Sequence, residues 1–172
     1  MRDSTPLAAV QQGSLWDFAL DFYGRPGVAR RLLFLQDEAG MDVCVLLWRL
    51  WLGHLGLAPT PSAEQALGEV ADWQRDYTWP LRERRRWLKP AAACDPELAR
   101  LRQTLKDAEL LAEKTALAKL EALSRRAGRV APLPAGARVT LAGEPALRPT
   151  ADQAATLAAL RAELPAGAAG SR

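Results

Sequence analysis

The feature that most constrains the fold is a long helical pattern that opens at Asp95-Pro96 and ends near Gly128. Within ELARLRQTLKDAELLAEKTALAKLEALSRRAG, apolar residues step by three or four, which is the spacing of one face of an α-helix. They are Leu98, Leu101, Leu105, Ala108, Ala112, Ala116, Leu120 and Leu123. At 1.5 Å per residue the helix is roughly 45 Å long, so it spans its domain or projects from it.

Helix start and stop signals predict several shorter helices before this one. Ser14 and Asp42 are typical N-cap residues, Pro26 and Pro61 suit a first helical position, and Gly40 suits the residue after a last turn. The predicted helices cover residues 15–23, 26–39, 43–55, 61–77 and 80–89. No strand-like alternation, internal repeat or glycine-rich phosphate loop accompanies them. We therefore expect an all-α, single-domain helical bundle of about five to six helices, with one long C-terminal helix and a poorly ordered tail.

The predicted helical domain covers residues 14–128, and residues 1–13 are expected to be a flexible N-terminus. Residues 129–172 are rich in Pro, Ala and Gly, which indicates a linker and tail with room for one short helix over 151–163. This segment contains few large apolar residues, so we expect its deletion to leave the melting temperature nearly unchanged.

Composition excludes some classes of function. The 172 residues carry 23 basic and 20 acidic side chains, so the net charge of +3 gives only weak support for nucleic acid. Two cysteines, Cys44 and Cys94, and the single His54 lack the spacing of a structural zinc site. The first residues do not resemble a signal peptide, and the apolar run over 43–57 is too short to span a bilayer. We expect a cytoplasmic protein with no cofactor and no membrane contact.

Polar side chains interrupt the apolar N-terminal half and form the first candidate binding site. The candidates are Asp17, Asp21, Arg25, Gln36, Asp37, Asp42 and Arg49. Carboxylates from facing helices can hold a divalent metal ion in a bundle. Helix caps and ion pairs account for the same residues without a ligand, and the metal-binding spacings of di-iron bundles are missing.

Arg49 lies among large apolar residues, and a buried guanidinium needs a partner. We expect Arg49 to be at least partly buried and paired with a carboxylate from one of the two preceding helices, namely Asp17, Asp21 or Asp37.

The second candidate site is the basic segment LRERRRWLK, flanked by Trp79 and containing Trp87. Its cations are Arg82, Arg84, Arg85, Arg86 and Lys89. Arginines beside tryptophans can hold phosphates and stack on bases, which is typical of an RNA-binding surface. The alternative is a solvated helix face whose tryptophans turn into the core.

Several stretches resemble one family of short bacterial proteins. The resemblance covers residues 14–123 and is carried by LWDFALDFYGRPGVARRLLFLQDEAGMDVCVLLWRLWLG, DWQRDYTWPLRERRRWLK and KDAELLAEK. The most specific parts are Y-x-R-P-G-V and L-Q-D-x-x-G-x-D-V. The family it implies is one of conserved hypothetical proteins, a domain of unknown function, and it transfers no catalytic residue to this chain.

The chain offers a bundle, a long amphipathic helix and a basic, tryptophan-bearing face, but no nucleophile beside a base. We therefore favour a small helical protein that binds another protein or acts as an adaptor, and we do not expect an enzyme. The alternatives are an RNA- or ribosome-associated protein that uses residues 82–89, and a metal or small-ligand site in the acidic cluster.

Overall fold

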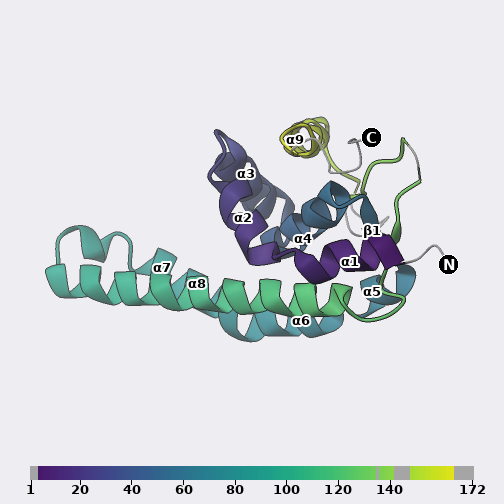
Figure 1. Cartoon of the computed structure of the whole chain (residues 1–172). Helices are drawn as coiled ribbons and strands as arrows, with labels where there is room; N and C mark the ends of the chain where they lie inside the picture. The colour runs from purple at the N-terminus through teal and green to yellow at the C-terminus, as the bar shows by residue number, and fades with distance from the viewer. Residues whose placement is uncertain (1–3, 135, 142–147, 165–172) are drawn as a thin grey trace.

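The computed structural model describes residues 4–134, 136–141 and 148–164, and helices form most of them (Figure 1). In chain order the elements are α1 (Ser4–Gln12), α2 (Leu15–Tyr23), α3 (Val28–Ala39), α4 (Val43–His54), β1 (Leu57–Pro59), α5 (Pro61–Gln65), α6 (Gly68–Trp73), the π-helix η1 (Gln74–Thr78), α7 (Trp79–Trp87), the 3₁₀-helix η2 (Ala91–Ala93), α8 (Pro96–Ser124), β2 (Val130–Pro132) and α9 (Ala151–Ala162). The predicted all-α class is confirmed, with one small two-stranded sheet in addition. None of the described helices combines the length and the apolar character that crossing a bilayer requires.

The helices α2, α3 and α4 begin and end close to their predicted limits because of local caps. The hydroxyl of Ser14 accepts from the backbone N–H of Asp17, and the carboxylate of Asp42 accepts from the first N–H groups of α4. Gly40 closes α3 in the left-handed conformation that glycine adopts without strain. Residues 46–52 of α4 are all buried, so this helix is the centre of the fold.

A π-helical turn divides the next helical region. The π-helix η1 continues α6 and leads directly into α7. A π turn holds one residue more than an α-helical turn, so it rotates the following helix by about 100° relative to the preceding one. Thr78 at the end of η1 and Leu88 after α7 are buried, while Trp87 faces solvent. The sequence predicted a continuous helix over 61–77 and missed both the π turn and the break between α5 and α6.

The long helix α8 is buried over its C-terminal half only. Of the predicted apolar stripe, Ala112, Ala116, Leu120 and Leu123 are buried, whereas Leu101 is 49% exposed. The N-terminal half extends away from the rest of the molecule, with α7 lying alongside it (Figure 1). The helix thus joins the core to a projecting helical arm.

Both segments predicted to lie outside the helical domain contribute to its core, which corrects the sequence-based boundaries. The predicted flexible N-terminus over 1–13 contains α1, whose Val10 is fully buried. The predicted linker contributes β2, which pairs antiparallel with β1. Downstream, Val139, Leu141, Leu157 and Leu160 are buried. These residues belong to the same core cluster as the buried residues of α4, so segments on both sides of 14–128 help to cover this helix. The end of the predicted tail, residues 165–172, lies outside the described residues.

Candidate functional site

A pocket of about 710 Å³ lies between the connection from α3 to α4 and the helices η1 and α7. Its lining residues are Gln36, Asp37, Gly40, Met41, Asp42, Val43, Cys44, Gln74, Trp79, Arg82, Glu83, Arg86 and Trp87. The α7 residues among them recur at helical spacing, so one face of α7 forms a wall of the pocket.

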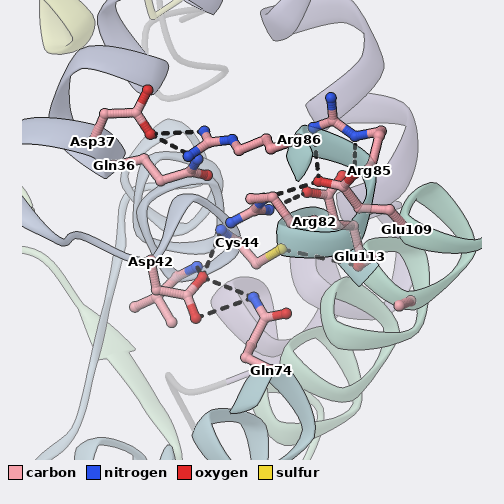
Figure 2. Close-up of polar contacts among 12 residues, drawn as sticks. Gln36, Asp37, Asp42, Cys44, Gln74, Arg82, Arg85, Arg86, Glu109 and Glu113 are labelled. Atoms are coloured by element: carbon pink, nitrogen blue, oxygen red, sulfur yellow. Dashed lines mark hydrogen bonds and ion pairs between the residues drawn. The ribbon is translucent and has the colours of Figure 1, made fainter. Parts of the chain in front are cut away.

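Asp42 links the two sides of this pocket. Its Oδ1 accepts from the backbone N–H groups of Cys44 and Val45, at 2.8 and 3.2 Å. The amide of Gln74, a residue only 2% exposed, donates from Nε2 to Oδ1 at 3.0 Å and Oδ2 at 3.1 Å (Figure 2). These bonds fix the N-terminus of α4 against η1.

Two carboxylates of α8 hold α7 in place from behind the pocket. Arg82 donates from Nε to Oε1 of Glu109 at 2.8 Å and from Nη2 to Oε1 of Glu113 at 2.6 Å, and Arg85 also donates to Glu109 (Figure 2). Glu109 is only 5% exposed. A buried network of this kind is stable because each charge has a partner and several hydrogen bonds.

This network shifts the pKa values of its two carboxyl groups in opposite directions. Burial alone would raise the pKa of Glu109, but the hydrogen bonds from Arg85 and Arg82 outweigh it and hold the pKa below its ordinary value of 4.5. Burial raises the pKa of Glu113 above 4.5, although Arg82 opposes this shift. Glu109 therefore keeps its charge to a lower pH than Glu113 does.

A third arginine of α7 reaches the other side of the pocket. Arg86 donates from Nη2 to Oδ1 of Asp37 at 2.8 Å (Figure 2). This bond lowers the pKa of Asp37 below its ordinary value. Both side chains are more than 40% exposed, so the pair contributes little to stability and leaves room for a ligand to displace it.

The tryptophans of α7 are the most unusual part of the pocket surface. Trp87 is 72% exposed and Trp79 is 46% exposed, although tryptophan is one of the more buried residue types on average. The alternative in which they turn into the core is wrong. Glu83, itself exposed, lies four residues from each of them on the same helix face.

The acidic candidate site does not form a single cluster. Asp17 is exposed on α2, and Asp21 pairs with Arg25 at 2.9 Å. Arg25 also donates to the backbone carbonyl of Glu163, at the end of α9. Gln36, Asp37 and Asp42 line the pocket instead. Across residues 4–134, 136–141 and 148–164, no group of three potential metal-binding side chains gathers at one point.

Arg49 is buried as predicted, but the predicted partner is wrong. The side chain is 4% exposed, and Nη2 donates to Oε2 of Glu64 at 2.5 Å. Nη1 donates to the backbone carbonyl of Thr140 at 3.2 Å. Asp21 pairs with Arg25 and Asp37 with Arg86, while Asp17 is exposed. Arg49 instead meets α5 and the 136–141 segment.

The basic candidate site is divided between two roles. Arg82 and Arg85 bind the carboxylates of α8, and Arg86 binds Asp37, while Arg84 and Lys89 are exposed. Three of the five cations therefore already have anionic partners within the chain. The pocket unites Gln36, Asp37 and Asp42 from the first candidate set with Arg82 and Arg86 from the second.

Sequence reasoning missed Glu109, Glu113, Gln74 and Glu83. The only available signal was a match of charge patterns, since Arg82 and Arg85 are one turn apart and so are Glu109 and Glu113. Such a match does not specify which helix faces which, because the partners are more than twenty residues apart.

The fold and pocket define a small helical protein with a projecting α7–α8 arm and a mixed aromatic and charged pocket at its base. Residues 14–120 match the family described as Protein of unknown function (DUF2390), and the chain belongs to this family. No curated protein and no solved structure matches the chain.

Proposed function

We propose that this protein binds another protein, and that the pocket beside α7 receives an apolar side chain of the partner with a basic residue next to it. The observation that carries this proposal is the exposure of Trp79 and Trp87 on the face of α7 that lines the pocket. Tryptophan and arginine dominate the binding energy of many protein interfaces, and both are present here.

The charge that remains available at the pocket favours a basic partner residue. Arg82 and Arg86 are engaged by carboxylates of this chain, whereas Glu83 is exposed between the two tryptophans. A lysine or arginine of the partner could pair with Glu83 and stack on the face of Trp87. Because Arg82 and Arg86 are paired with carboxylates of this chain, they offer less positive charge to RNA phosphates. Protein binding is therefore better supported than RNA binding.

We also place the protein in the cytoplasm as part of this proposal. Cys44 and Cys94 are both free, which suits a reducing compartment.

Affinity capture with the full chain tests the proposal. We expect Trp87→Ala to lose partners that the wild type retains, because truncation removes an exposed anchor without disturbing the core. Leu20→Ala is the matched control, since Leu20 is 54% exposed on α2 and does not line the pocket. The proposal also predicts that Glu83→Lys weakens capture and that the retained partners bind through a basic, apolar segment.

Equal capture by the wild type and Trp87→Ala would overturn the proposal. So would partners that bind equally well to Glu83→Lys. Retention of RNA in place of protein, with binding that weakens steeply as salt rises, would favour the RNA alternative instead.

A further inference from the structure

The outer face of α8 carries an uncharged stripe that is different from the buried one. We call it the α8 stripe, and its residues are Leu101, Thr104, Ala108, Leu111, Thr115, Ala118 and Ala122. The residues step alternately by three and four, which is the spacing of a coiled-coil seam. Every one of them is at least partly exposed, and Leu111 is 65% exposed. Nothing in the described part of the chain buries this seam.

The two threonines add to the apolar character of the α8 stripe. The hydroxyl of Thr104 donates to the carbonyl of Arg100 at 3.2 Å, and that of Thr115 donates to the carbonyl of Leu111 at 3.0 Å. Because the hydroxyl protons are used within the helix, these residues do not need water as an acceptor. Their burial against another helix therefore costs less than the burial of a free hydroxyl group.

We propose that the α8 stripe binds the same stripe of a second copy of this chain, with the two helices antiparallel. In an antiparallel coiled coil the seam residues pair in layers, and this register places Leu111 against Ala108 of the second copy and Leu101 against Ala118. Thr104 then meets Thr115. Each large side chain faces a small one, which is the arrangement that lets two helices approach closely.

The charges beside the stripe support this orientation and partner. Arg100, Asp107, Lys114 and Glu121 follow at intervals of seven along one flank, so their signs alternate. The antiparallel register brings Asp107 opposite Lys114 of the second copy and Arg100 opposite Glu121 of the second copy. Because the interface is symmetric, each of these two charge pairs forms twice.

The central pair contributes most to this complementarity. Glu121 already accepts from the backbone N–H of Leu15 and pairs with Arg125. Asp107 and Lys114 are exposed and pair with no opposite charge in the described part of the chain; Asp107 accepts from the amide of Gln103, and Lys114 lies over the ring of Trp16. In a parallel pair, the same flank would face Leu105, Ala112 and Lys119, which offer no opposite charge to Asp107 or Lys114. A second copy in antiparallel orientation thus fits both the shape and the charge of the stripe.

The proposed contact leaves the pocket accessible. Glu109 and Glu113, which bind α7, lie on the other side of α8 from the stripe. The contact from residue 101 to residue 118 is about 26 Å long at 1.5 Å per residue. Self-association through α8 and partner binding beside α7 are therefore separate properties, and either can fail without the other.

Sedimentation of the full chain over a range of concentrations tests the proposal. We expect a reversible dimer in the wild type and at least about a tenfold weaker dimer in Asp107→Lys, because this change places two lysines together at two symmetric positions. The double variant Asp107→Lys/Lys114→Asp restores opposite charges and should return the dissociation constant to within about threefold of the wild type. Asp152→Lys, on the exposed side of α9, changes the net charge equally and should leave the dimer unaffected.

Oxidative cross-linking tests the orientation. In a Cys94→Ser background, mixed Leu101→Cys and Ala118→Cys chains should form the 101–118 disulfide, and Leu101→Cys alone should not dimerise covalently. A wild type that stays monomeric at high micromolar concentration would overturn the proposal. So would a dimer that is indifferent to Asp107→Lys, a double variant that stays as weak as the single one, or a dominant 101–101 disulfide.

Discussion

Arg49 of α4 donates a hydrogen bond to Glu64 of α5, and this pair connects the buried central helix to the partly exposed helix that covers it. The two side chains differ in burial, since 4% of the Arg49 side chain and 36% of the Glu64 side chain are exposed. Arg49 is therefore the member of the pair that needs a counter-charge, because water cannot solvate its buried guanidinium.

This difference predicts unequal effects of removing either partner. Glu64→Gln should lower the free energy of unfolding by roughly 3 kcal/mol, because it leaves a buried guanidinium without a counter-charge. Arg49→Met should cost about 1 kcal/mol or less, since an apolar side chain replaces the buried charge and Glu64 can turn to water. Urea unfolding measures both values, and equal effects would contradict this account of the pair.

Glu109 should give the stability of the protein a pH dependence. We expect Glu109→Gln to cost about 3 kcal/mol near pH 7, because Arg82 and Arg85 lose their shared carboxylate. The folded-state pKa of Glu109 lies below 4.5, so its contribution is complete above that pH and is lost as pH falls through the folded value. The difference between variant and wild type should therefore narrow in acid.

The pH measurement must be separated from the titration of Glu113, which pairs with the same arginine. Its pKa is raised, so its contribution has the opposite sign and is lost as pH rises through the folded value. Because the charge of Glu109 is one cause of this shift, Glu109→Gln is also compared with its parent in a Glu113→Gln background, where Glu113 no longer titrates. A difference that stays constant between pH 7 and pH 3 would show that Glu109 is not held ionised.

Substitution of Gly53 tests whether the 136–141 segment packs against α4. A Cβ at this position would lie 2.6 Å from Cγ1 of Val139, so Gly53→Ala should be destabilising, by about 1 to 3 kcal/mol, although alanine is normally the better helix former. Val139→Ala should remove most of that penalty in the double variant. Additive effects of the two substitutions would place Val139 elsewhere.

The two cysteines should differ in reactivity. Burial raises the pKa of Cys44 well above its ordinary value, and this thiol is only 4% exposed, whereas Cys94 is exposed. A thiol-specific reagent should label one cysteine rapidly in the native protein and both in denaturant. Cys94→Ser should abolish the rapid phase, and persistence of that phase would contradict the burial of Cys44.

The deletion of residues 129–172 should now lower the melting temperature by more than about 5 °C, which reverses the expectation from composition. For a domain of this size such a shift corresponds to roughly 1 kcal/mol or more. The reason is that Leu157 and Leu160 are buried even though the segment is rich in small residues. Leu160→Ala should reproduce much of the loss, whereas Ala155→Ser at an exposed position should not.

Local features of the sequence predicted local structure well. Ser14, Gly40 and Asp42 cap their helices because a cap depends on residues a few positions away. The burial of Arg49 followed from its apolar neighbours along one helix. Its partner did not, because the choice among carboxylates depends on which helix covers α4.

The candidate site shows the same limit. The arginines of α7 were identified as a group, but their partners lie 24 to 31 residues later, on a helix whose rotation no local signal specifies. Composition also misrepresented the C-terminal region, since two buried leucines suffice to pack one face of an otherwise alanine-rich helix against the core. Position in the fold, and not the number of large residues, decided its role.

The π turn η1 makes the pocket sensitive to chain length as well as to side-chain chemistry. Loss of one residue from Gln74–Thr78 would let α6 and α7 join as an uninterrupted α-helix and would turn α7 by about 100°. Trp79 and Trp87 would leave the pocket wall, and Arg82 would lose its alignment with Glu109. Insertion or deletion of one codon could thus create or abolish this wall of the pocket in one step.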